Sequence, residues 1–325
     1  MNVKGIKRGF HYDPLAQSLG VYVDGVHVEN FSASTTPRYY VDQHTGSNSN
    51  GGRSWDDAFL TYQAGVTAAT VAANAYEDVT MYVGPGEYDE EVIIPCNTTA
   101  CQASSGDTWL GYKIGRFRII HLGKACILKN STAKLSHTLD ILRMKTEIYG
   151  GTFRNYTLTS TLADACAIHF ERSNAGNYGD VINAKLIDAK IEGRPASAKT
   201  TIGVDVEAAQ YVWIERCVFS GWDTGILVAG NSLGAPVENV IRDCYFRGNT
   251  NDILLGASQF TLIEDCKFAD DGTTLFVGAS DWTGRTGTNT DCLCTGAILN
   301  TTSINSGKFP SISGVNVVDS HTHDR

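Results

Sequence analysis

Apolar and charged positions recur as a short phrase in the second half of the chain. The phrase is apolar, charged, charged, Cys, any residue, Phe, and it appears as IERCVF ending at Phe219, IRDCYF ending at Phe246 and IEDCKF ending at Phe268. Two related phrases with a smaller residue in the Cys position end at Phe153 and Ile191. The repeat therefore covers at least residues 148–268.

The spacing of the repeat is uneven. From position 151, the Cys position recurs at 189, 217, 244 and 266, which are intervals of 38, 28, 27 and 22 residues. Each phrase is short and rich in Val, Ile, Phe and Tyr, and turn residues lie between phrases, which is typical of strands joined by loops of variable length. Short strands bury their apolar face by stacking coil on coil, about 4.8 Å apart, so the pattern predicts an all-β parallel solenoid.

Two inward columns of side chains follow from this stacking. Cys217, Cys244 and Cys266 are expected to lie one above another inside the solenoid, with the Phe residues two positions later in a second inward column. The chain has nine cysteines, an odd number, and these three have apolar neighbours. Both observations favour buried, reduced thiols over a disulfide framework.

The two charged residues before each Cys are predicted to occupy a bend between strands. Vertical neighbours of opposite sign favour this register by about 0.2–1 kcal/mol per pair. We interpret them as a solvated ladder of charges, although carboxylates placed there are also candidates for catalysis. The two columns are Glu215, Arg242 and Glu264, and Arg216, Asp243 and Asp265.

Residues 54–75 are predicted to form an amphipathic helix. The sequence S-W-D-D at 54–57 resembles a capping box. The first coil of a solenoid exposes its core and unpaired edge groups, so we expect the helix to cover that end. Apolar residues follow the start at helical spacing, at Phe59, Tyr62, Val66 and Ala69.

The same region resembles a known family. It contains Y-Y-V-D at 39–42, a Gly- and Asn-rich loop at 46–52, S-W at 54–55 and V-G-P-G-E-Y at 83–88. These segments are similar to those that lead into the first coil of pectate-lyase-like β-helix proteins. The resemblance implies a right-handed single-stranded parallel β-helix with an N-terminal capping α-helix. It implies no single activity, because the superfamily contains lyases, hydrolases, phage tailspikes and inert virion scaffolds.

An N-terminal hairpin arm, residues 1–37, precedes this region. The sequence V-Y-V-D-G-V-H-V at 21–28 predicts a hairpin with a two-residue Asp-Gly turn. A hairpin this small is marginal alone, so it should pack on the first coil or on a partner. It resembles the short anchors by which phage β-helix proteins attach to a virion. The residues assigned to attachment are Lys4, Lys7, Arg8, Tyr22, Asp24 and Gly25.

Composition argues against two kinds of partner. The net charge of −9 leaves no broad basic surface, which argues against nucleic acid. No apolar run is long enough for a membrane helix or a secretory signal. We therefore expect no membrane insertion, and folding in a host cytoplasm.

A polysaccharide hydrolase on this fold would need two carboxylates across a groove. Asp205 and Glu207 are expected to share one strand face, and Asp223 follows Trp222, whose indole is the candidate for stacking on a sugar ring. A lyase would instead use carboxylate-bound calcium and an arginine of the bend columns as its base. A solenoid stacks carboxylates by repetition alone, so these residues do not by themselves predict an enzyme, and no cofactor is expected.

His321 and His323 form a His-x-His pair near the C-terminus. Two positions apart on an extended chain, they would face the same way, and three chains around an axis would present six imidazoles to a transition metal. The pair resembles the His-x-His clusters of trimeric phage spikes. The alternative is a solvated polar tail.

The sequence therefore predicts four segments: the arm at 1–37, a leading strand and capping helix at 38–78, a parallel β-helix at 79–310 and a tail at 311–325. Among the proteins that the chain resembles, the shortness of the β-helix and of its 37-residue arm favours a structural bacteriophage virion protein, a homotrimer bound through its arm to capsid or tail proteins as a decoration or tail-associated protein. The second hypothesis is a tailspike that binds or depolymerises a host surface glycan. The third is a cellular polysaccharide lyase or hydrolase.

Overall fold

The computed structural model describes backbone and side chains over 36–72, 78–95, 115–131, 137–155, 165–171, 181–193, 201–231, 234–256 and 258–268. Helix residues 73–74 and the strands at 8–13, 18–23, 26–30, 274–278, 292–295, 298–300, 315–318 and 321–323 are described by their backbone. Within these residues, no helix has the length and hydropathy that a bilayer crossing requires.

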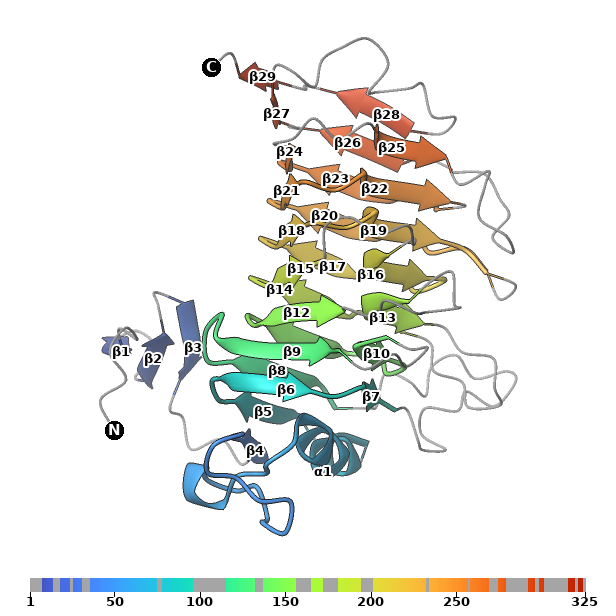
Figure 1. Ribbon diagram of the computed structural model, residues 1–325. Helices are drawn as coiled ribbons and strands as arrows, with labels where there is room; N and C mark the ends of the chain where they lie inside the picture. The colour runs from blue at the N-terminus through green and yellow to red at the C-terminus, as the bar shows by residue number, and fades with distance from the viewer. Residues whose placement is uncertain are drawn as a thin grey trace.

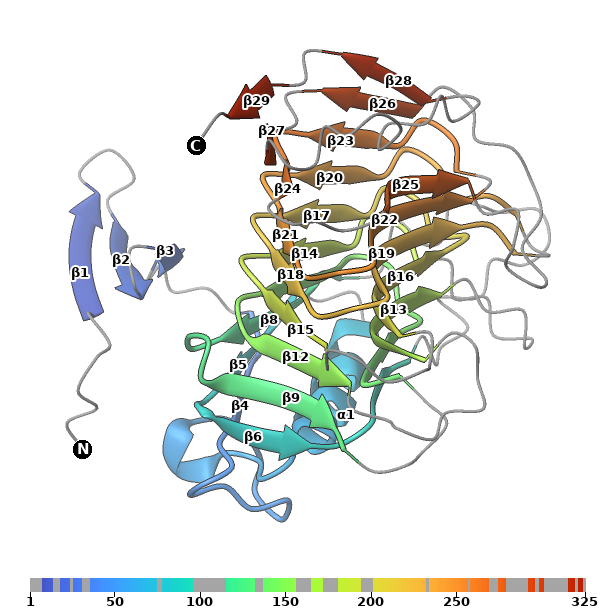
Figure 2. The ribbon, with the colours of Figure 1, turned by 45° about the horizontal axis from the view of Figure 1, so that its top comes forward.

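The chain winds into a column of coils whose strands form three parallel sheets (Figures 1 and 2). Each complete coil contributes one strand to each sheet. The ten-stranded sheet contains β4 (Arg38–Val41), β5 (Val79–Val83), β8 (Phe117–His121), β11 (Thr146–Tyr149), β14 (Lys185–Ile187), β17 (Trp213–Glu215), β20 (Val240–Arg242), β23 (Leu262–Glu264), β26 (Cys292–Thr295) and β28 (Val315–Val318).

The other two sheets complete each coil. The nine-stranded sheet contains β6 (Gly86–Asp89), β9 (Cys126–Asn130), β12 (Thr152–Asn155), β15 (Lys190–Glu192), β18 (Val218–Ser220), β21 (Tyr245–Arg247), β24 (Lys267–Phe268), β27 (Ile298–Asn300) and β29 (His321–His323). The seven-stranded sheet contains β7 (Val92–Ile94), β10 (Leu139–Ile141), β13 (Cys166–Glu171), β16 (Ile202–Glu207), β19 (Thr224–Ala229), β22 (Asn251–Gly256) and β25 (Thr274–Gly278). The predicted all-β parallel solenoid is confirmed.

The two inward columns are also confirmed. The three Cys residues of the repeat are free thiols without exposed surface. Phe219, Phe246 and Phe268 are register partners, and their rings stack with centroids 5.0 and 5.2 Å apart. The repeat therefore exists because every coil must supply a side chain of matching size to a continuous apolar column.

The predicted bend holds only one of the two charged residues in each phrase. Glu215, Arg242 and Glu264 are the last residues of their strands. The following residues, Arg216, Asp243 and Asp265, have φ of 52°, 51° and 52°. This left-handed conformation turns the chain through the corner and directs the next residue, Cys, back into the core.

The capping helix begins later than the sequence predicts. Residues Trp55–Asp57 form a 3-10 turn, η1, without a side-chain cap from Ser54, and α1 spans Tyr62–Asn74. Glu90 caps it from outside, because its carboxylate accepts the backbone N–H groups of Tyr62 at 2.7 Å and of Gln63 at 3.1 Å. The helix packs beside β4 and β5 at the end of the column (Figure 1), as expected.

The N-terminal strands form a sheet of their own, whereas the C-terminal strands extend the parallel sheets. Strands β1 (Arg8–Asp13), β2 (Ser18–Val23) and β3 (Val26–Asn30) form an antiparallel sheet of their own, in which Val23 pairs with Val26 as the hairpin requires. The C-terminal segment continues the coils, since β28 and β29 extend two of the parallel sheets, whereas the sequence placed both in a separate tail.

His121 makes stability depend on pH. Its imidazole is buried between the Tyr62 hydroxyl, 3.2 Å from Nε2, and the Tyr149 carbonyl, 3.1 Å from Nδ1. Burial lowers the pKa of His121 from 6.5 to about 4. A depressed pKa stabilises the fold above pH 6.5, so we expect the free energy of unfolding to fall by about 3 kcal/mol as pH drops from 6.5 to 4. Urea titrations at each pH measure this change.

The matched variant is His121→Phe, which keeps a ring at this position but does not titrate. It should be less stable at neutral pH, because the Tyr62 hydroxyl and the Tyr149 carbonyl lose their partner. Its stability should lack this part of the pH dependence. If the free energy of unfolding fell equally with pH in both proteins, groups other than His121 would be responsible for the acid sensitivity.

Candidate functional site

Polar side chains gather on the outer face of the seven-stranded sheet, on three consecutive coils. Asp140 of β10, His169 of β13 and Asp205 of β16 are register partners. Glu171 and Glu207, each two residues further along its strand, are partners as well. The residues between them on β13 and β16 lie in the apolar core, so alternation along the strands turns all five polar side chains outward. We call these five residues the His169 cluster.

The imidazole of His169 lies at the centre of the cluster. Nε2 is 3.1 Å from Glu207 Oε2, whereas Nδ1 is 3.3 Å from Asp140 Oδ1 and 3.9 Å from Glu171 Oε2. The His169 side chain is 4% exposed, and those of Asp140, Glu171 and Glu207 are 17%, 31% and 16% exposed. Asp205 has no exposed surface. The cluster therefore has a buried centre and carboxylates that reach solvent.

The charge state of His169 is set by competing effects. Burial by itself lowers the pKa of His169, but contacts with the carboxylates of Asp140 and Glu207 and the charge of Asp205 outweigh it and hold the pKa well above its ordinary value. The imidazole can therefore remain protonated and donate its Nε2–H to Glu207. This hydrogen bond fixes the orientation of the Glu207 carboxylate, whose side chain is 16% exposed.

The cluster is not a ladder produced by repetition. In the next coil, the partner of Asp205 is Leu227 and the partner of Glu207 is Ala229. Both belong to a small buried apolar group on this sheet, together with Leu254 of the following coil. At these register positions, carboxylate and imidazole side chains therefore lie on β10, β13 and β16, whereas β19 carries Leu227 and Ala229, as expected of a site and not of a register device.

A second histidine borders the cluster. The ring of His137 lies with its centroid 4.1 Å from that of His169, at an interplanar angle of 38°. Its Nδ1 is 3.1 Å from the Sγ of Cys166, which is buried at the start of β13. His137 thus covers one side of the His169 imidazole and adds to its burial.

The structure brings together only two of the three predicted catalytic carboxylates. Asp205 and Glu207 share one face of β16, as predicted. Asp223 accepts the backbone N–H of Thr201 at 2.9 Å, just before β16 begins, whereas Glu207 ends that strand. About 3.3 Å per residue places Asp223 on the order of 20 Å from Glu207. Burial raises the pKa of Asp223, partly offset by the Thr201 hydrogen bond.

The interpretation of Trp222 as a sugar-stacking residue is wrong. The side chain is 2% exposed, and its Nε1–H donates to the carbonyl of Ile191 at 3.1 Å. Gly193 makes room for it, because a Cβ at that position would lie 2.7 Å from the indole Cδ2. The ring fills the interior beside the strands and offers no face to a ligand.

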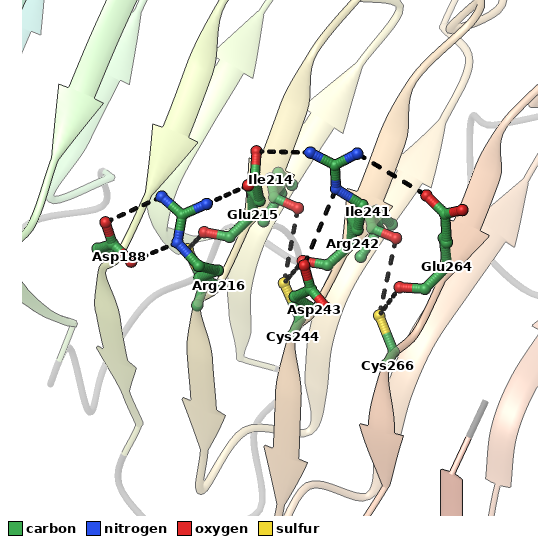
Figure 3. A network of polar contacts seen from close by, with 11 residues as sticks. Asp188, Ile214, Glu215, Arg216, Ile241, Arg242, Asp243, Cys244, Glu264 and Cys266 are labelled. Carbon is green, nitrogen blue, oxygen red and sulfur yellow. Dashed lines mark hydrogen bonds and ion pairs between the residues drawn. The ribbon is translucent and has the colours of Figure 1, made fainter. Parts of the chain in front are cut away.

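One of the two columns of bend charges forms the ladder that the sequence predicts, whereas Asp243 of the other column lies 3.9 Å from Arg242 and not against Arg216 (Figure 3). Arg242 lies 3.2 Å from Glu215 and 3.9 Å from Glu264, its partners in the coils on either side. Arg216 lies 2.8 Å from Asp188 and also pairs with Glu215. Since both guanidinium groups are held by carboxylates, a role for either as a lyase base has no support here, and partly exposed pairs of this kind contribute little stability.

Several predicted residues lie outside the described side chains. Lys4, Lys7, Asp24 and Gly25 fall outside the described residues. Arg8, Tyr22, His321 and His323 lie on strands β1, β2 and β29, of which the structure describes the backbone. The attachment and C-terminal metal interpretations therefore remain predictions.

His169, Asp140 and Glu171 were missed by the sequence analysis, although a signal was present. The sequence I-H-F-E at 168–171 matches V-D-V-E at 204–207 in its alternation of apolar and polar residues and in its final Glu. The repeat was traced through Cys and Phe, which lie at the corner before the nine-stranded sheet and on that sheet. A search for the same alternation would have aligned His169 with Asp205.

Comparisons with known proteins agree on the architecture. No family model matches the chain, and no curated protein matches it in sequence. Among solved structures, a pectin methylesterase in complex with a hexasaccharide superposes with a TM-score of 0.54 at 12% identity, covering 89% of this chain and 90% of that one. The rice weevil pectin methyl esterase gives 0.56 at 10% identity, covering 92% of each chain.

The fold is a right-handed parallel β-helix. The pectin methylesterases that superpose on the chain share this architecture, which the resemblance in the sequence implied. A GH136 lacto-N-biosidase from Eubacterium ramulus is a further structural neighbour, with a TM-score of 0.56 at 11% identity, covering 88% of this chain and 56% of that one. This β-helix fold is thus shared with carbohydrate-active proteins.

Proposed function

We propose that this protein hydrolyses a carbohydrate substrate at the His169 cluster, with Glu207 as the general base. The observation that carries the proposal is the hydrogen bond between a buried imidazole and a carboxylate that reaches solvent, 3.1 Å long, on a face where the next coil is apolar. Such a carboxylate is oriented to take a proton from water. Asp205, without exposed surface, acts on the substrate only through His169.

The substrate class is supported by the structural neighbours. The solved structures with TM-scores above 0.5 include pectin methylesterases and a lacto-N-biosidase, whose names refer to carbohydrates. The two names describe different reactions on one fold, an ester cleavage and a glycosidic cleavage. Fold likeness alone does not choose between them, so the proposal rests on the geometry of Glu207.

The test is an activity screen with the purified full-length chain. Pectins, bacterial capsular polysaccharides, lipopolysaccharides and milk-type oligosaccharides would be incubated with the protein, and new reducing ends, released methanol and released acyl groups would be measured. We expect hydrolysis of at least one class. Absence of every product would overturn the proposal and leave glycan binding, measured on the same polysaccharides by calorimetry, as the remaining carbohydrate function.

A second candidate function is attachment to a virion, and one observation favours it. Strands β1 to β3 pair only with one another among the described strands. A three-stranded antiparallel sheet of this size gains stability by packing on another surface. We propose that it docks on a capsid or tail protein, and that three copies in a closed trimer strengthen attachment through their effective concentration.

Removal of the arm should separate attachment from folding. A chain that begins at Pro37 keeps every strand of the three parallel sheets, so we expect unchanged thermal unfolding and an unchanged oligomer in light scattering. Co-sedimentation with virions that carry the protein should be lost. Full occupancy of the particles by the shortened chain would remove the arm from the attachment mechanism.

A further inference from the structure

The two nitrogens of His169 face two different coils. Nε2 is directed to Glu207 on β16, and Nδ1 is directed to Asp140 on β10, its register partner. Glu171, on the same strand as His169, approaches Nδ1 from the side. The parallel register fixes all three strands, so these groups converge without any movement of the backbone.

The Nδ1 side of the imidazole lacks a hydrogen bond. Nδ1 of His169 and Oδ1 of Asp140 are buried atoms without a hydrogen-bond partner, although they lie only 3.3 Å apart. When Nε2–H donates to Glu207, neutral imidazole presents a lone pair at Nδ1 to a carboxylate oxygen. The facing atoms Nδ1 and Oδ1 therefore need a positive charge at this place, which either the second proton of an imidazolium or a bound metal ion can supply.

We propose that Asp140, Nδ1 of His169 and Glu171 bind one divalent first-row metal ion, such as Zn²⁺ or Mn²⁺. Their ligand atoms all lie within 4.8 Å of one another. Metal–ligand lengths of about 2.1 Å at tetrahedral angles require separations of about 3.4 Å between ligand atoms. The observed 3.3 and 3.9 Å from Nδ1 to the two carboxylates are close to that value.

The donor types select the class of metal. An imidazole nitrogen is a ligand for Zn²⁺ and its neighbours in the first row, whereas Ca²⁺ and Mg²⁺ take oxygen ligands. Three protein ligands also leave a coordination position open toward solvent, which Glu171 reaches with 31% of its side-chain surface. We therefore expect a water molecule as the fourth ligand.

The other half of the cluster would support the metal from outside. A metal-bound histidine commonly donates its second ring N–H to a carboxylate, which fixes the tautomer and the ring orientation. Glu207 occupies this place at Nε2, with Asp205 buried beside it. A proton competes with the metal for Nδ1, so binding should release protons. The inference concerns metal binding and stands whether or not the protein is a hydrolase.

Calorimetric titration of chelator-treated full-length protein with Zn²⁺ and with Mn²⁺ tests the site. We expect one metal ion per chain for at least one of them. Asp140→Asn, which preserves shape, should weaken affinity by about 10–100-fold or more, and His169→Gln should abolish it. Glu264→Gln, at the bend of the ten-stranded sheet, is the matched control and should bind as the parent protein does.

Spectroscopy detects metal binding without an activity assay and shows whether each variant is folded. Co²⁺ bound by the parent protein should give visible absorption bands that Asp140→Asn changes, while circular dichroism shows that this variant is folded. Absence of Zn²⁺ and Mn²⁺ uptake with excess metal would overturn the proposal. Binding that persists unchanged in folded Asp140→Asn and His169→Gln would overturn it as well.

Discussion

Glu207→Gln should reduce hydrolysis of the carbohydrate found in the activity screen by about 10²–10⁴-fold, the usual contribution of a general acid–base group. Glutamine keeps the shape of the side chain and still accepts a hydrogen bond from His169, but it cannot take a proton from water. The loss should appear in kcat more than in KM, because the amide occupies the same volume. Steady-state kinetics measures both values.

Asp223→Asn is the matched control for this variant. It makes the same change of carboxylate to amide on a residue that lies at the opposite end of β16, where its carboxylate accepts the backbone N–H of Thr201. We expect its activity to equal that of the parent protein. If Asp223→Asn lost activity and Glu207→Gln retained it, the site would have to be moved to the other edge of the seven-stranded sheet.

Cys244→Asp should destabilise the protein by about 3–5 kcal/mol or prevent it from folding. Cys244 has no exposed surface, and its Sγ lies 3.6 Å from the carbonyl of Ile214 and 3.3 Å from that of Arg242. A carboxylate there would face carbonyl oxygens within an apolar column. Burial and the neighbouring thiols raise the pKa of Cys244 well above its ordinary value, because the position disfavours negative charge.

Denaturant unfolding of two further variants identifies the cause. Tyr245→Asp introduces the same charge on the adjacent residue, which is 36% exposed, and should cost less than about 1 kcal/mol. Cys244→Ala removes the sulfur without adding charge and should cost an intermediate amount, through the small cavity alone. Equal stability of Cys244→Asp and Tyr245→Asp would contradict the inward direction of the Cys column.

The sequence predicted the coils correctly because equivalent positions in successive coils must carry side chains that pack on one another. Cys217, Cys244 and Cys266 occupy equivalent corners, and the Phe residues after them stack, so the apolar pattern itself contains the architecture. Local signals near the cap were weaker guides. S-W-D-D leads into a 3-10 turn, in which the Asp57 carboxylate accepts the backbone N–H groups of Gly51 and Arg53. The cap of α1 is Glu90, which lies far away in sequence and comes from the first coil.

The position of Trp222 also required the tertiary structure. An aromatic residue followed by Asp in a Gly-containing loop is expected to be exposed. The indole of Trp222 is nevertheless buried, because Gly193 on the preceding coil has no side chain to exclude it. Nothing near Trp222 in the sequence shows which residue will face it. The packing partner comes from the neighbouring coil.

The sequence by itself determined the all-β parallel solenoid, the inward columns and the shared face of Asp205 and Glu207, since each depends on periodicity within a strand or between equivalent strands. Only the tertiary structure decided that His169 stands between Asp140 and Glu207. These residues are 29 and 38 positions from it along the chain. The loops between coils vary in length, so sequence spacing does not specify register, whereas backbone hydrogen bonding between parallel strands does.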